Sequence, residues 1–337
     1  MRRSRFFSRP DWHDRVARYY GSASARFSPF EIPGGEQPVR AGYHLMQEWA
    51  VPRVGRSPRA SDGVGANRFV ALRFGTAPAS DYLDPMNGCE DPALLLNTAL
   101  SDAGEAGARF LWWSNVPRPS DLFEELAGRA ESDHRARVIP CVSTLGIEGG
   151  RSFEDYLSAM SRNRRRNFWR FRKKADGLAP HFHCGALTKA DVEFLLRHQE
   201  RRARASEHLG AIIDDERFTR LIRSLVGMEG VEAARLELEG EPASVLLILR
   251  DTEGAAIYAQ AFDIRWADRL YPSLALISFF VEHAFERGVG YIDFLRGTES
   301  YKRRFVDREI TMAKFVYDLS DAPEADRLAE WVGGVEE

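Results

Sequence analysis

A group of charged and aromatic side chains near the C-terminus has the residue types of an acyl-transfer site. Lys302, with Tyr301 beside it, closely follows Glu299 and Asp293. A cation can stabilise the oxyanion of a tetrahedral intermediate, and a carboxylate can take the proton of an attacking amine. We therefore treat these four residues as candidate catalytic residues. The alternatives are a strand Asp293 paired with an arginine and a solvated basic turn at Lys302.

A second group of residues suggests a site for the phosphate-bearing part of an acyl donor. A predicted helix begins at Ser273, and helix N-termini bind phosphate through free backbone N–H groups and the helix dipole. The strand and loop that precede this helix add backbone and cationic groups. We assign donor binding to Tyr258, Gln260, Ala261, Arg265 and Ser273. Asp263 and Tyr271, in the same loop, are candidates for substrate contact.

One strand–loop–helix–strand–loop unit must position both groups. An apolar strand is predicted over 256–262, a polar aromatic loop over 263–272 and an amphipathic helix over 273–288. A short strand over 291–295 follows, and the turn Arg296-Gly297 leads to Glu299. Units of this kind build sites where strand ends meet a helix N-terminus. We expect the candidate residues to converge there.

A long, basic helix is predicted from Ser152, its N-cap, to about Asp176. At about 100° per residue, its apolar residues share one stripe: Phe153, Leu157, Met160, Phe168 and Phe171. Arg164 falls inside this stripe and Asn167 on its border. An unpaired inward charge is costly, so Arg164 is expected to meet either a carboxylate or an anionic ligand. We assign Arg164 and Asn167 to substrate binding.

The outward face of the same helix carries cations. Arg162, Arg166, Arg170 and Lys173 point away from the apolar stripe, and no acid lies among residues 162–174. This pattern fits a face that contacts tRNA phosphates. It fits a solvated basic face equally well.

Composition limits the classes of protein to which the chain can belong. The net charge of the 337 residues is −3, which argues against nucleic-acid binding over the whole surface. No apolar run approaches the ~20 residues of a membrane span, and no secretory signal is evident. Three widely spaced cysteines indicate reduced thiols and a cytoplasmic protein. No residues lie at metal-ligand spacing, so we expect no metal.

The order of predicted elements indicates two lobes in an α/β (α+β) fold. Residues 1–65 read as an irregular segment with one short helix over 11–20. Alternating strands and helices over 66–149 predict an N-terminal lobe. Residues 150–320, with successive strands over 233–238, 243–250 and 256–262, predict a C-terminal catalytic lobe, and 321–337 a tail.

Several short motifs resemble the CelD-like, FemAB-like branch of the GNAT superfamily. They are Tyr271-Pro272-Ser273, Glu286-Arg287-Gly288, Tyr291-Ile292-Asp293-Phe294, Gly297-Thr298-Glu299 and Tyr301-Lys302-Arg303-Arg304-Phe305. The predicted helix after Phe153 and the Gly240-Glu241 turn are similar too, so the resemblance covers about 153–316. Asp81-Tyr82-Leu83-Asp84 more loosely resembles the family's N-terminal lobe.

This resemblance implies two GNAT-like lobes, each a mixed, mostly antiparallel sheet flanked by helices. It also implies transfer of an acyl or aminoacyl group. In the aminoacyl-tRNA-dependent peptidoglycan enzymes, a lysine at the position of Lys302 is associated with stabilising the tetrahedral intermediate. The usual GNAT phosphate loop, Gln/Arg-x-x-Gly-x-Gly/Ala, is absent between Phe262 and Ser273. The donor is therefore open between acyl-CoA and aminoacyl-tRNA.

The sequence leads to three hypotheses of function. The first is an N-acyltransferase that moves an acyl group from acyl-CoA, as co-substrate, to a small-molecule amine, with no permanently bound cofactor. The second is an aminoacyl-tRNA-dependent transferase of FemAB type that contacts tRNA through the basic helix over 162–174. The third is a non-catalytic GNAT-like binding module.

Overall fold

The fold is described from a computed structural model. It describes residues 6–20, 25–32, 39–51, 67–74, 91–204, 216–321 and 323–334. The chain divides into two compact units, one of Met1–Phe6 with Ser143–Glu309 and one of Phe7–Val142 with Ile310–Glu337. The boundary between Val142 and Ser143 falls inside strand β5 (Ala136–Glu148), and the boundary between Glu309 and Ile310 falls inside strand β11 (Arg308–Asp318). We call the units unit 1 and unit 2.

The sheet of unit 1 runs from β5 to β6 in the order β5-β10-β9-β8-β7-β6. Its remaining strands are β10 (Tyr291–Arg296), β9 (Ala255–Phe262), β8 (Glu241–Arg250), β7 (Val231–Leu238) and β6 (His181–Ala186). Each neighbouring pair is antiparallel except β9 and β10, which are parallel. The β9–β10 ladder has two residue pairs, Ile292 with Ala255 and Asp293 with Ala256. Beyond them, no described strand pairs with the β10-facing edge of β9.

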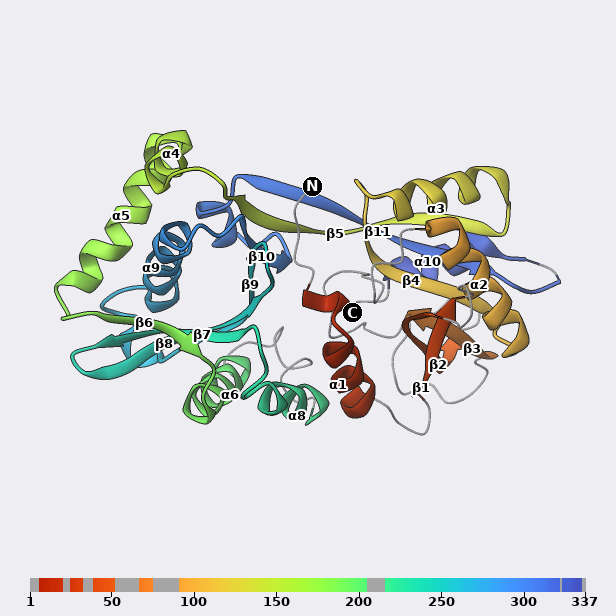
Figure 1. The fold of residues 1–337 in the computed structure, drawn as a ribbon, viewed down its shortest axis with the longest axis horizontal. Helices are drawn as coiled ribbons and strands as arrows, with labels where there is room; N and C mark the ends of the chain where they lie inside the picture. The colour runs from red at the N-terminus through yellow and green to blue at the C-terminus, as the bar shows by residue number, and fades with distance from the viewer. Residues whose placement is uncertain are drawn as a thin grey trace. The chain divides into compact units, whose positions relative to one another are not determined.

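Helices cover both faces of this sheet (Figure 1). One face carries α9 (Pro272–Glu286), and α4 (Phe153–Ala159) and α5 (Arg162–Asp176) pack on α9. The other face carries α6 (Lys189–Arg204), against which α8 (Glu216–Ser224) packs. Apolar side chains of α4, α5, α9 and the strands form one buried cluster. Burial of this surface stabilises the unit by about 25 cal/mol per Å² of apolar area.

The predicted single helix from Ser152 to Asp176 is wrong, because the chain breaks between α4 and α5. Ser152 caps α4 in a capping box with Asp155, whose side chain accepts from the Ser152 backbone. Met160 leaves the helix at φ −70° and ψ 146°. Ser161 then caps α5 by accepting from the backbone N–H of Arg164. Side-chain acceptors satisfy the free N–H groups of both helices, so the break costs little.

Unit 2 is built on β1 (Ala25–Ile32), β2 (Val39–Val51), β3 (Asn67–Phe74), β4 (Phe110–Pro117) and β11, in this order. Neighbouring strands are antiparallel except β3 and β4. Helices α2 (Pro92–Glu105) and α3 (Asp121–Ser132) pack on Leu111, Trp113 and Phe315. Helix α10 (Ala325–Gly334) packs on the alternate residues Phe110, Trp112 and Val316.

The α/β (α+β) fold class is confirmed, since each unit has a mixed, mostly antiparallel sheet with helices. The prediction of an irregular segment over 1–65 is wrong for β1 and β2, whereas the helix over 11–20 is present as α1 (Pro10–Tyr20). The bounds of units 1 and 2 differ from the predicted lobes 66–149 and 150–320. The lobes and the 321–337 tail stay predictions. The Asp81–Asp84 motif and Cys89 lie outside the described residues.

None of the described helices is long and apolar enough to cross a membrane.

Candidate active site

A cavity of about 600 Å³ lies in unit 1 between the end of β9, the start of α9 and the turn after β10. Its wall is formed by Gln260, Phe262, Ala267, Leu270, Tyr271, Pro272, Ser273, Leu274, Glu299, Tyr301 and Arg304. Five of these were predicted from the sequence as site residues: Gln260, Tyr271, Ser273, Glu299 and Tyr301. The predicted strand–loop–helix–strand–loop unit therefore encloses one cavity.

The N-terminus of α9 opens into this cavity without a side-chain cap. Tyr271 is the N-cap residue and makes no side-chain capping bond, and Pro272 has no N–H. The first helical bond is from Ala275 N to Tyr271 O, at 3.0 Å. The amides of Ser273 and Leu274 are thus left without an acceptor in the described structure. Such amides and the helix dipole favour an anion in the cavity.

Two polar side-chain atoms of the cavity wall also have no hydrogen-bond partner among the described residues. They are Gln260 Oε1 and Ser273 Oγ, both buried from solvent. Buried polar atoms in folded proteins almost always have a partner, and an orphan calls for an explanation. A polar ligand in the cavity supplies one.

The turn after β10 is shaped by Gly297, which has a φ of +102°. A Cβ atom at this position would lie 2.3 Å from Glu299 Oε2. Only glycine adopts this backbone at low cost and leaves room for the Glu299 carboxylate. A side chain at 297 would therefore displace the Glu299 carboxylate from its place on the cavity wall.

Lys302 follows this turn, and its side chain is only 5% exposed. Its Nζ donates to the carbonyl oxygens of Arg296 and Gly297 and lies 3.0 Å from Glu299 Oε2. Two of its N–H donors therefore meet carbonyl oxygens, and its charge is paired with the Glu299 carboxylate. Lys302 itself does not belong to the cavity wall. In this conformation Lys302 braces the turn that carries Glu299 and Tyr301.

Arg164 faces inward, as predicted, and contacts backbone carbonyl oxygens there. Its Nε donates to the carbonyl oxygen of Arg304 at 3.4 Å, and its Nη2 donates to that of Val306. The hydroxyl of Tyr156 donates to the carbonyl between them, Phe305 O, at 2.9 Å. Burial raises the pKa of Tyr156 and keeps this hydroxyl protonated. Among the described residues Arg164 thus bonds to backbone carbonyls and to no carboxylate, and its role in substrate binding stays a prediction.

Arg304 is a cavity residue that was not among the predicted site residues, because the spacing of Lys302-Arg303-Arg304 fits a solvated basic turn about as well as a functional one. Its guanidinium lies 5.8 Å from the centre of the Phe171 ring, and it makes no ion pair within the described residues. Arg303, the next residue back, pairs with Glu309 at 3.4 Å and is not part of the wall. The signal that separates the two arginines is a contact with α5, which is distant in sequence.

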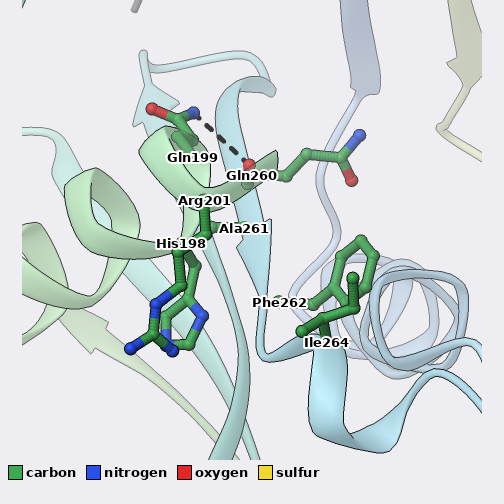
Figure 2. Close-up of a pocket in the computed structure, with 7 residues that line it drawn as sticks. All are labelled: His198, Gln199, Arg201, Gln260, Ala261, Phe262 and Ile264. Carbon is green, nitrogen blue, oxygen red and sulfur yellow. Dashed lines mark hydrogen bonds between the residues drawn. The ribbon is translucent and has the colours of Figure 1, made fainter. Parts of the chain in front are cut away.

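A smaller cavity, of about 60 Å³, lies between α6 and β9 and shares Gln260 and Phe262 with the main cavity (Figure 2). There the side chains of His198 and Arg201, from α6, point away from those of Gln260 and Phe262. Gln199 Nε2 donates to Gln260 O at 3.4 Å. Burial lowers the pKa of His198, although Asp263 opposes this effect. His198 thus lies where α6 packs on β9 and does not line the main cavity.

The remaining predicted site residues lie outside the wall of the main cavity. Burial acts to raise the pKa of Asp263, but hydrogen bonds from Arg265 outweigh it and the pKa is lowered. Arg265 is occupied by Asp263 and Glu241, at 2.6 and 3.1 Å. Asp293, on β10, accepts a hydrogen bond from Leu295 N at 2.8 Å. The others are Tyr258 and Ala261 on β9 and Asn167 on α5. Their predicted roles stay predictions.

The outward face of α5 is cationic in the structure. Arg162, Arg165, Arg166, Arg170, Lys173 and Lys174 are exposed, and none forms an ion pair within the described residues. The ring of Trp169, 44% exposed, lies on this face. We call these residues the α5 basic face.

No group of three or more His, Cys, Asp or Glu side chains among the described residues is arranged to hold a metal ion.

Residues 162–303 match the family model described as an acetyltransferase (GNAT) domain. This segment contains α5, the sheet from β6 to β10, α9 and the turn up to Arg303. No curated protein matches the chain in sequence.

Three solved structures share the fold at low sequence identity. FemX is 11% identical with a TM-score of 0.60, covering 97% of this chain and 94% of that one. L-PGS from Bacillus licheniformis is 12% identical with a TM-score of 0.56 and 98% of each chain covered. The C-terminal domain of a putative lysylphosphatidylglycerol synthetase from Agrobacterium fabrum is 14% identical, with a TM-score of 0.55 and coverage of 96% and 93%.

Proposed function

We propose that this protein is an N-acyltransferase of the FemAB-like branch of the GNAT superfamily, with an acyl-CoA donor and an amine acceptor. The match of residues 162–303 to the GNAT domain model and the fold shared with FemX support this proposal. The observation that carries the proposal is the uncapped N-terminus of α9 in the 600 Å³ cavity. The amides of Ser273 and Leu274 suit the phosphates of CoA. A cavity of this size suits a cofactor-sized ligand.

The edge of β9 supports a second part of donor binding. Its ladder with β10 ends at Ala256, and a strand edge can bind an extended ligand through added backbone hydrogen bonds. Gln260, with its unpartnered Oε1, lies on this stretch and lines the cavity. An extended donor that reaches from the α9 N-terminus along β9 accounts for both features.

The chemistry requires one base and one oxyanion-stabilising group. The amine nitrogen attacks the thioester carbonyl carbon, a C–N bond forms, and the C–S bond breaks with release of the CoA thiol. Glu299, 54% exposed and on the cavity wall, is the candidate acceptor of the amine proton. Lys302 is the candidate for the oxyanion, and to reach it the ammonium exchanges its contact with Glu299 for the substrate oxygen.

The proposal is tested by incubating the protein with acetyl-CoA and longer acyl-CoAs, each with mixtures of amino acids, polyamines and amino sugars. Amine-dependent release of CoA thiol, with an acylated amine found by mass spectrometry, is the expected result. The proposal would be contradicted if no acyl-CoA raised the melting temperature and no mixture caused release of CoA thiol.

The α5 basic face favours a second candidate, an aminoacyl-tRNA-dependent transferase. Its six unpaired cations and exposed Trp169 suit the phosphates and bases of RNA. Binding of tRNA to this face would weaken steeply as the salt concentration rises. Transfer of a radiolabelled amino acid from charged tRNA, with no thiol release from acyl-CoA, would favour this candidate over the first. A module that binds either donor without transfer would be the third, non-catalytic alternative.

We also propose a cytoplasmic location, since both candidate donors, acyl-CoA and charged tRNA, occur inside cells.

A further inference from the structure

Arg304 is a cavity cation whose charge is not used by the fold. Neighbouring cations of the same region are occupied: Lys302 by Glu299 and two carbonyls, Arg265 by Asp263 and Glu241, and Arg303 by Glu309. Arg304 lines the cavity and has no acidic partner within the described residues. Its guanidinium is thus available to an anion.

The backbone of Arg304 is held more firmly than a solvated turn requires. Arg164 and Tyr156 donate to three successive carbonyl oxygens, those of Arg304, Phe305 and Val306. The N–H of Arg304 donates to Tyr301 O at 3.2 Å. Side chains of α4 and α5 therefore fix the origin of the Arg304 side chain. A fixed cation loses less conformational entropy on binding a ligand than a free one.

Arg304 also lies near the N-terminus of α9. Its guanidinium is 5.8 Å from the centre of the Phe171 ring, and the Tyr271 ring is 6.3 Å from that same centre. Tyr271 is the N-cap of α9. Arg304 and the N-cap residue of α9 thus contact the same Phe171 ring. The helix N-terminus and the guanidinium face the same cavity.

We propose that Arg304 is the phosphate-binding side chain of the donor site and takes over the task of the absent glycine-rich phosphate loop. A phosphate or pyrophosphate group binds between the α9 amides and the Arg304 guanidinium, which can form two parallel N–H···O bonds with it. This inference rests on the proposed function, since the phosphate belongs to the acyl donor. CoA and the 3′ end of tRNA both carry such groups.

Binding measurements on matched variants test the assignment. Calorimetry measures the dissociation constants of CoA, of pantetheine, which has no phosphate, and of the ribotrinucleotide CCA, for the native chain, Arg304→Gln and Arg303→Gln. Both variants remove one charge from the same turn, but Arg303 is exposed and outside the cavity wall. We expect Arg304→Gln to raise the dissociation constant of CoA at least about tenfold and to change that of pantetheine by less than about twofold. Arg303→Gln should bind both ligands about as tightly as the native protein does.

Three outcomes would overturn the assignment, and one would support it with a different donor. Equal losses for the two variants would show a general effect of net charge. Equal losses of CoA and pantetheine in Arg304→Gln would show that the phosphates are not what Arg304 binds. If the native chain binds CCA but not CoA, an Arg304 effect on CCA supports the assignment and the acyl-CoA donor fails alone. If it binds neither, both proposals fail.

Discussion

The Nε of Arg164 donates to the carbonyl oxygen of Arg304 at 3.4 Å, and so ties α5 to the turn that carries the candidate site. The sequence spacing correctly placed Arg164 on the inner side of its helix. What it meets there is backbone, at Arg304 and Val306. An arginine fork suits two carbonyls of one turn because its donors point in fixed, diverging directions. We regard Arg164 as a positioning residue.

Replacing Arg164 by Met should lower the free energy of unfolding by about 1–3 kcal/mol, because it leaves buried carbonyl oxygens without donors. Arg164→Lys should recover part of this loss, since a lysine reaches only one carbonyl well. Urea unfolding measures both. Arg165→Met is the matched control, as Arg165 is exposed on the α5 basic face and should change stability by less than about 0.5 kcal/mol. Equal losses at Arg164 and Arg165 would contradict the positioning role.

Lys302 and Glu299 should give different results on replacement, although they lie 3.0 Å apart. Lys302→Met removes the donor to two carbonyl oxygens in a buried site, and should cost about 1–3 kcal/mol of stability as well as at least about tenfold in transfer. Glu299→Gln changes an exposed carboxylate and should affect transfer alone. Parallel unfolding and steady-state assays separate the two effects.

A loss of transfer in Lys302→Met with unchanged stability would favour the oxyanion role over bracing of the turn. Normal transfer in Glu299→Gln would remove Glu299 as the base.

The strand–loop–helix–strand–loop unit was predictable because its signals are local. Pro272 starts α9 and Gly288, at a φ of +67°, follows its end, as the preferences of proline and glycine lead one to expect. The break between α4 and α5 was missed because Leu157, Met160, Phe168 and Phe171 are all buried and keep one helical phase across it. Ser161 was the available signal, as an N-cap residue.

Two other features were missed for different reasons. In β1, the pairing register with β2 shifts between Phe30 and Glu31, and a bulge of this kind breaks the alternation by which a strand is recognised. Arg304 was missed because its environment depends on α5, which lies far away in sequence. Local charge pattern alone cannot distinguish it from Arg303.

Gly297→Ala should separate backbone strain from displacement of Glu299. Gly297 and Gly240 both have positive φ, +102° and +79°, so alanine at either should cost about 1 kcal/mol of stability. A Cβ at Gly240 meets nothing within 4 Å, whereas one at Gly297 meets the Glu299 carboxylate. We expect similar unfolding midpoints for the two variants, but a loss of transfer only in Gly297→Ala. Equal activity of the two would show that the position of Glu299 is not critical.

Stability at acid pH should depend on Asp191, whose carboxylate binds Arg235 where α6 meets β7. Burial acts to raise the pKa of Asp191, but hydrogen bonds from Arg235 and Thr188 outweigh it and lower the pKa. A depressed native pKa gives stability that is fully present above the unfolded value of about 3.9 and is lost as pH falls through the native pKa. Asp191→Asn should destabilise the protein by up to about 3 kcal/mol at pH 7. Its stability should also fall less steeply below pH ~4 than that of the native chain, which denaturant titrations at several pH values would show.

Ser273→Asp should change the stability of α9 and the affinity for the donor in opposite directions. A carboxylate in the first turn stabilises a helix by about 0.3–1 kcal/mol, and α9 has no side-chain cap of its own. The same carboxylate would occupy the place proposed for the donor phosphate and repel it. We therefore expect a higher melting temperature for the free protein and a CoA affinity reduced at least about tenfold, by calorimetry at fixed salt. Ser273→Asn, similar in size but neutral, should keep most of the affinity. If the two variants bind CoA equally, no phosphate lies at the α9 N-terminus, and the donor must be held elsewhere in the cavity.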